Sequence, residues 1–131
     1  NIMEEVKIEL KVIVGLSLLN VWLLNYNKPS RWRGADAKTM MEEFDAYGLS
    51  SSLCYIVGFL KVGFALVLLS SIIYPNLEIL ATSVNLEILA ASILGALLSG
   101  SILMHIKIKD AAIKSLPATL FLIFCLSIIV L

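Results

Sequence analysis

The sequence is poor in the residues that build most catalytic and metal sites. It contains one histidine, His105, and two cysteines, Cys54 and Cys125, which form no CxxC pair. Charged residues make up 15% of the chain, against about 25% in ordinary soluble domains. Ten basic and ten acidic residues cancel, so no nucleic-acid partner is expected. With a single histidine, a bis-histidine haem within the chain is excluded, and these residues require no metal or cofactor.

Apolar residues are abundant and lie in four long segments. Hydrophobic residues make up 60% of the chain, against roughly 45–50% in soluble domains. The segments cover about residues 8–26, 53–73, 79–104 and 113–131, each close to the ~20 residues that a membrane-crossing helix needs. Helices are expected because backbone polar groups must be satisfied internally in lipid. The sequence predicts one integral membrane domain over residues 1–131, an all-α transmembrane four-helix bundle in a lipid bilayer.

The basic residues predict the orientation of these spans. The second connection is expected to be a tight turn at Tyr74–Asn76, and together with the two termini it leaves only Lys7 and Lys11 on its side. The first and third loops carry seven basic residues: Lys28, Arg31, Arg33, Lys38, Lys107, Lys109 and Lys114. Because cytoplasmic loops are enriched in Lys and Arg, these two loops are expected on the cytoplasmic, stromal or matrix side. Both termini then lie on the opposite side, and the identity of the membrane stays open.

The first loop contains a stretch with helical periodicity between Asp36 and Gly48. We expect Asp36 to cap this short helix and Gly48 to end it. Apolar side chains recur on one face, opposite charged ones, at Ala37, Met40, Met41, Phe44 and Tyr47. The pattern is typical of an amphipathic helix at the membrane interface. Packing as a cap under the bundle is equally compatible with it.

Two of the apolar segments each contain one internal charge, Lys61 in the second and Glu87 in the third. An ionisable group at such depth costs roughly 2.5–3.5 kcal/mol on insertion scales and should face other helices. Counted from the predicted turn, Lys61 lies about 18 Å deep and Glu87 about 12 Å. We therefore predict a buried ion pair or shared polar cavity between them, with Asn20 as a third polar neighbour. The pair could only set helix register, or it could form a proton, ion or small-ligand site.

Other polar residues are expected near the interface. Arg31, Trp32 and Arg33 in the first loop are candidates for contact with lipid phosphate or a partner. His105 is a candidate ligand for a metal, a haem or a chlorophyll magnesium, or it hydrogen-bonds a loop or lipid headgroup. No base is placed to activate a hydroxyl nucleophile, so no catalytic residue is predicted, and whether the protein is an enzyme stays open.

The order of these features resembles the DoxX-like family of small four-helix membrane proteins. The resemblance rests on Gly34, Met41–Leu49, Tyr55–Val62, Ala65–Leu69, Gly95–Ala96, Met104–His105, Lys107, Asp110 and Lys114–Ala118. It implies a compact four-helix bundle but no single activity, since some relatives are linked to quinone-dependent sulfur oxidation or redox stress assemblies. One departure concerns Lys61, because this position is commonly acidic in the family.

Three functions are compatible with the sequence. The first is a non-catalytic accessory subunit of a larger membrane complex, for which an energy-transducing complex is one candidate. The second is a quinone-linked redox or proton or small-molecule transport component that uses the polar site at Lys61 and Glu87. The third is pigment binding through His105. Across the three functions, the candidate ligands are quinone, lipid and chlorophyll. A polar cavity of ligand size that reaches a surface would favour the second function over the first.

Overall fold

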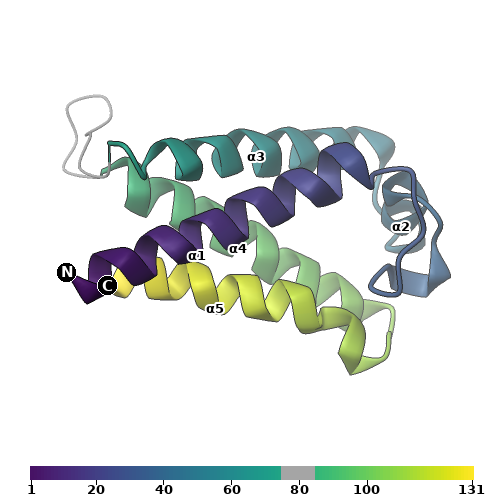
Figure 1. The fold of residues 1–131 in the computed structure, drawn as a ribbon. Helices are drawn as coiled ribbons and strands as arrows, with labels where there is room; N and C mark the ends of the chain where they lie inside the picture. Colours follow the sequence, from purple (N-terminus) through teal and green to yellow (C-terminus); the bar gives the residue numbers. More distant parts are fainter. Residues whose placement is uncertain (75–84) are drawn as a thin grey trace.

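The computed structural model describes residues 1–74 and 85–131, and these residues form five α-helices (Figure 1). The helices are α1 (Ile2–Leu19), α2 (Met40–Ala46), α3 (Ser51–Ser70), α4 (Leu86–Lys107) and α5 (Leu116–Val130). A π-helical turn, Asn20–Leu24, extends α1, and 3₁₀ turns occupy Gly34–Asp36 and Ala112–Ser115. The all-α prediction is confirmed.

Polar caps decide where three of the long helices begin. The side chains of Asn1, Ser50 and Asn85 each accept a hydrogen bond from a backbone N–H in the first turn of the following helix. The cap at Asn85 starts α4 at Leu86, whereas the apolar run predicted a start at 79. The start of α1 at Ile2 is earlier than the predicted 8. The predicted turn at Tyr74–Asn76 falls mostly at residues 75–84, outside the described residues.

The four long helices pack side by side around an apolar core. Helix α1 contacts α3 and α5, and α4 contacts α3 and α5. Fully buried side chains include Val14, Leu68, Leu94 and Ile128, one from each helix. Helices α1 and α5 lie close at the end that holds both termini and diverge toward α2 (Figure 1). The two ends of the molecule therefore differ: the terminal end is closed by helix packing, and the α2 end is wider.

Three helical segments are long and apolar enough to cross a membrane: Ser51–Ser70, Leu86–Lys107 and Ala112–Val130. At most a third of each segment is buried inside the protein, 28%, 33% and 11% in turn. Large apolar side chains such as Phe59 (79% exposed) and Leu103 (61% exposed) point outward. Helix α1 is not among the three, because its first half carries Glu4, Glu5, Lys7, Glu9 and Lys11.

The first loop packs against the ends of the long helices. Helix α2 is capped by Thr39, whose hydroxyl accepts the Glu42 N–H at 3.1 Å, so the predicted cap at Asp36 is wrong. Asp36 lies in the preceding 3₁₀ turn, where Lys114 pairs with it at 3.2 Å. The chain leaves the helix through Gly48 at φ +79°, a conformation that favours glycine. Met40 and Phe44 pack against Trp22 and Cys54, which supports the interpretation of α2 as a cap.

Candidate functional site: a cavity at the α2 end

The structure separates Lys61 from Glu87, so the predicted ion pair between them is wrong. Lys61 Nζ donates to Ser101 Oγ at 3.0 Å, in the second half of α4. Glu87 lies in the first turn of α4, about 21 Å along the helix from Ser101. The prediction failed because the depth of Glu87 was counted from a turn at 74–76, whereas α4 begins only after Asn85.

Glu87 instead joins two lysines of α1 at the terminal end. Its carboxylate oxygens lie 2.7 Å from Lys11 Nζ and 3.1 Å from Lys7 Nζ. Lys11 is 2% exposed and also donates to the Ser71 carbonyl at 3.2 Å. A carboxylate in the first turn of a helix is favoured by the helix dipole. This group, the Glu87 cluster (Lys7, Lys11 and Glu87), therefore ties α1 to α4 through one carboxylate that pairs with two ammonium groups.

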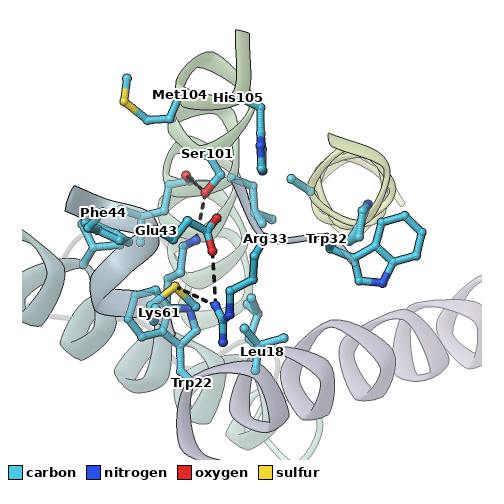
Figure 2. A pocket seen from close by; sticks show the side chains of 18 of the residues that line it. Leu18, Trp22, Trp32, Arg33, Glu43, Phe44, Lys61, Ser101, Met104 and His105 are labelled. Atoms are coloured by element: carbon cyan, nitrogen blue, oxygen red, sulfur yellow. Dashed lines mark hydrogen bonds and ion pairs between the residues drawn. The ribbon is translucent and has the colours of Figure 1, made fainter. Parts of the chain in front are cut away.

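Lys61 faces a cavity of about 760 Å³ at the other end, which we name the α2-end cavity (Figure 2). Its walls come from the end of α1 and its π-helical turn, from the first loop, and from α2, α3, α4 and α5. The volume lies within the ~300–1,000 Å³ typical of small-molecule sites. Most of the wall is apolar, and the polar side chains on it are Ser17, Asn20, Asn25, Ser30, Arg33, Glu43, Tyr47, Lys61, Ser101, His105 and Lys114.

Lys61 is the polar group deepest in the spanning region of this cavity. It is 7% exposed, and its ammonium lies 5.5 Å from the centroid of the Trp22 ring. Gly58, one turn earlier on α3, makes room for that indole, because a Cβ at this position would lie 2.7 Å from Trp22 Cζ3. Within residues 1–74 and 85–131, no carboxylate lies within 4.0 Å of the Lys61 ammonium. A lysine has three donors, and Ser101 accepts one of them.

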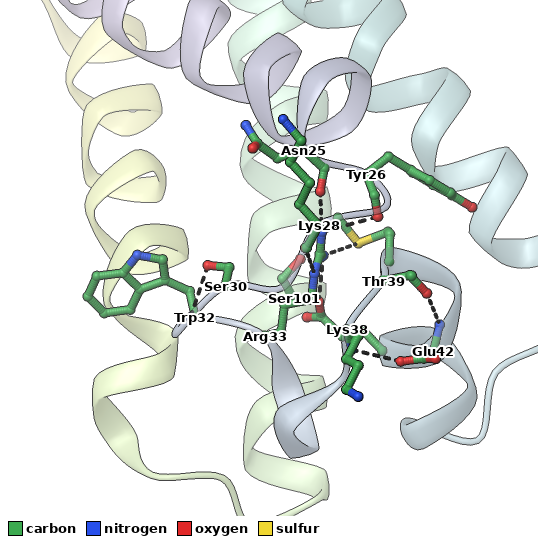
Figure 3. A network of polar contacts seen from close by, with 12 residues as sticks. Asn25, Tyr26, Lys28, Ser30, Trp32, Arg33, Lys38, Thr39, Glu42 and Ser101 are labelled. Atoms are coloured by element: carbon green, nitrogen blue, oxygen red, sulfur yellow. Dashed lines mark hydrogen bonds and ion pairs between the residues drawn. The ribbon is translucent and has the colours of Figure 1, made fainter.

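The prediction that Arg33 contacts lipid is wrong, because Arg33 points inward. It is 4% exposed and pairs with Glu43 at 3.2 Å. Its remaining donors reach the carbonyls of Asn25 at 2.6 Å, Tyr26 at 3.2 Å and Lys28 at 3.0 Å (Figure 3). Arg33 thus holds the first loop closed beneath the cavity. Arg31 stays exposed and stacks at 4.6 Å on Trp32, which lines the cavity wall.

A second set of polar contacts joins α2 to the end of α4. Tyr47 donates to Glu43, and its hydroxyl lies 3.4 Å from His105 Nε2. His105 Nδ1 lies 2.7 Å from Asp110 Oδ2, and Asp110 Oδ1 accepts the Ala35 N–H at 3.1 Å. Both ring nitrogens of His105 therefore have partners, which argues against the predicted ligation of a metal or pigment. Within the described part of the chain, no three His, Cys, Asp or Glu side chains gather as metal ligands.

The ionisation of two groups in this set follows from their surroundings. Burial raises the pKa of Tyr47 well above its ordinary value, and the charge of Glu43 raises it further, so this hydroxyl stays protonated. Burial would raise the pKa of Asp110, but hydrogen bonds from His105 and the Ala35 N–H outweigh it and leave the pKa below its usual value. Asp110 is thus a stable anion at neutral pH.

Asn20 lies on the wall of the α2-end cavity but not beside Lys61 as predicted. It is exposed and accepts a hydrogen bond from Asn25 Nδ2 at 2.8 Å. Asn20 starts the π-helical turn, in which the Asn25 N–H reaches back to the Asn20 carbonyl at 3.0 Å. Such turns are frequent at functional sites. Of the three predicted members of the polar site, Lys61 and Asn20 share the cavity and Glu87 lies elsewhere.

Sequence reasoning missed Glu43, although a signal for it was present. Glu43 is 9% exposed and lies between Met40 and Tyr47 at spacings of three and four residues, on the buried face of α2. Only apolar residues were expected on this face, and Glu43 was assigned no role. Its burial depends on Arg33, ten residues earlier in an irregular loop, and that loop conformation is not predictable from periodicity.

The long apolar helices with outward-facing apolar side chains define a small integral membrane protein. The chain belongs to the DoxX-like family, whose model matches residues 30–128. This match confirms the resemblance seen in the sequence. Searches of curated proteins and of solved structures each give no significant match.

Proposed function

We propose that this protein binds an amphipathic small molecule in the α2-end cavity, as a membrane transport or redox component. The observation that carries the proposal is a cavity of about 760 Å³ with a buried ammonium in its wall. A charge in the membrane region is costly and usually marks a functional site. The apolar walls suit the tail of a lipid-like or quinone-like ligand, and the polar groups near α2 suit its head.

We further propose that α1 and its π-helical turn form a fourth span, so that the protein is a transmembrane four-helix bundle. The stretch from Val12 to Leu24 carries no charge. Lys7 and Lys11, in the half of α1 that bears charges, both pair with Glu87. The basic first and third loops meet at one end, where Lys107 Nζ donates to the Tyr47 carbonyl at 2.9 Å. By the positive-inside rule this end faces the cytoplasm, stroma or matrix.

The test for ligand binding is to fill the cavity without disturbing the helices. Gly100 lines the cavity, and a Cβ there would meet no described atom within 4 Å. Gly63 on α3 is equally open but does not line the cavity, so Gly63→Leu is the matched control for Gly100→Leu. The two variants and the wild-type protein are purified in mild detergent, and bound small molecules are identified by native mass spectrometry.

We expect a co-purifying amphiphile with wild type and Gly63→Leu, and loss of most of it with Gly100→Leu. A cavity that carries nothing in any of the three proteins, also after addition of membrane lipid extract and quinone, would overturn the proposal.

The accessory-subunit function is the second candidate. The open position at Gly63 lies on the outer face of α3, near the exposed side chains of Phe59 and Leu66. A glycine on a lipid-facing surface permits close approach of another helix. If a larger membrane complex docks there, Gly63→Leu releases its subunits during purification and Gly100→Leu retains them. The same pair of variants therefore separates the two functions.

A further inference from the structure

Among the described residues around the α2-end cavity, the ionisable side chains are paired with one another, with one exception. Arg33 and Glu43 compensate each other at 3.2 Å, and His105 is paired with Asp110 at 2.7 Å. Lys114, at the rim, pairs at 3.2 Å with Asp36, whose side chain is 98% exposed. Each of these groups has an ionisable partner of the opposite type, acid or base, within 4.0 Å. Lys61 is the exception among the described residues that line the cavity.

Neither Glu43 nor Asp110, the nearest acidic groups, forms an ion pair with the Lys61 ammonium. Glu43 lies beside the Lys61–Ser101 contact (Figure 2), but its two oxygens are engaged by Arg33 and by the Tyr47 hydroxyl, and it makes no ion pair with Lys61 within 4.0 Å. Asp110 is turned toward His105 and the Ala35 N–H, outside the cavity. In a low-dielectric region an uncompensated ammonium is strongly unfavourable, and a bound anion would remove that cost.

We propose that the α2-end cavity binds a single-chain amphiphile with a carboxylate head, of the fatty-acid class, and that Lys61 is its charge partner. The inference rests on the proposed function and narrows its ligand to an anion. Lys61 Nζ and Ser101 Oγ lie 3.0 Å apart, so the two oxygens of one planar carboxylate can accept from both. Figure 2 shows the two side chains meeting inside the cavity near Glu43.

The rest of the cavity suits a chain rather than a second charge. Beyond the Lys61–Ser101 contact, the wall continues through Leu18, Leu97 and Phe121. Ser101 also lies 3.3 Å from the Leu97 carbonyl, a long hydrogen bond that its hydroxyl can give up to donate to a ligand. A carboxylate head bound to Lys61 and Ser101 lies on the side of the cavity formed by Trp22. The hydrocarbon tail of the ligand then extends between α1, α4 and α5.

The experiment compares three probes that differ only in the head: oleate, oleyl alcohol and methyl oleate. Their dissociation constants are measured on the full chain in mild detergent at pH 8.5, by displacement of a fluorescent fatty acid. The proteins are wild type, Lys61→Met, Lys61→Arg and Ser101→Ala. Lys38→Met is the matched control, because Lys38 is an exposed lysine of the first loop that does not line the cavity.

For the wild-type protein we expect oleate to bind at least about tenfold more tightly than either neutral probe, as a charge-assisted hydrogen bond gives. Lys61→Met should erase that preference while keeping the affinity for oleyl alcohol, which shows that the cavity is still formed. Lys61→Arg and Lys38→Met should keep the preference, and Ser101→Ala should reduce it a few-fold.

Equal binding of the three probes by the wild-type protein would overturn the inference and leave the proposed function standing. An oleate preference that survives in Lys61→Met would also overturn it, because the charge partner would then lie elsewhere. Binding of none of the probes by wild type would overturn the inference, and the mass-spectrometric test above would then decide the proposed function separately. If Lys61→Met binds none of the probes, the Ser101→Ala variant decides instead. An oleate preference in Ser101→Ala equal to that of the wild-type protein would then count against the inference.

Discussion

Each end of the helix assembly contains a buried lysine, and the two lysines differ in whether a carboxylate pairs with them. At the terminal end, Lys11 is 2% exposed and Glu87 lies 2.7 Å from its ammonium, with Lys7 as a second cation. At the α2 end, Lys61 is 7% exposed and its one described hydrogen-bond partner is the Ser101 hydroxyl. The first arrangement ties α1 to α4, and the second is part of the wall of a cavity of about 760 Å³.

This difference separates a structural from a functional use of the same residue type. A buried lysine with a carboxylate against it and no cavity beside it holds helices together, and removing one partner leaves a costly charge. A buried lysine without such a partner, next to a cavity, keeps its donors for something else.

Removing the carboxylate at the terminal end should have the largest effect. Glu87→Gln leaves two lysines, one turn apart on α1, without their counter-ion on α4, and should lower the free energy of unfolding by about 3–5 kcal/mol. Thermal unfolding in detergent, followed by circular dichroism, measures the loss. The triple variant Lys7→Met, Lys11→Met, Glu87→Leu should recover much of it. A Glu87→Gln protein as stable as wild type would contradict the role of the cluster.

Adding one methyl group to α3 should have an intermediate effect that depends on which face is chosen. A Cβ at Gly58 would lie 2.7 Å from Trp22, so Gly58→Ala must displace the indole beside the α2-end cavity, at a cost of about 1–3 kcal/mol. Gly63→Ala meets no described atom within 4 Å, and a helical glycine-to-alanine change there should be neutral or stabilising. Equal stabilities of the two variants would show that Trp22 is not packed as described. Tryptophan fluorescence provides an independent readout of its displacement.

Changing pH should produce the smallest effect, at the loops of the α2 end. The pKa of Asp110 is lower in the folded protein than in the unfolded chain, so this carboxylate stabilises the fold above pH ~4, and the contribution is lost as the pH falls below that value. Asp110→Asn should therefore lower the melting temperature at pH 7, by the equivalent of about 1 kcal/mol, and should flatten its decline below pH 4. A parallel decline in wild type and variant would contradict the assignment.

Much of the helical architecture was predictable because it depends on local and compositional signals. Apolar runs predicted the positions of α3 and α5 within a few residues, since both a helix and a bilayer impose a length that a sequence must meet. Ser50 and Asn85 are residue types favoured at helix N-caps, so both caps could have been predicted. Asn85 as an N-cap predicts the observed start of α4 at Leu86. The apolar run alone misplaced it, because hydrophobicity continues through residues 79–84 and carries no boundary signal.

The candidate site was predicted only in part, because it depends on contacts between distant segments. Sequence reasoning singled out Lys61 from its cost in a membrane, and this reasoning needs no knowledge of the neighbours. It paired Lys61 with Glu87 by assuming a turn and a depth. It also missed Glu43, because the burial of this acidic residue is favourable only when Arg33 of the first loop pairs with its carboxylate.

By itself, the sequence determined that this chain is a helical membrane protein of the DoxX-like family. It also determined that Lys61 and Glu87 both face other helices, and that the basic first and third loops lie at the same end of the molecule. These properties follow from composition, helical period and charge, which are local. Only the tertiary structure decided which cation meets which anion. Ion pairing depends on a few ångströms across helices, and a shift of a helix start moves every side chain behind it along the bundle.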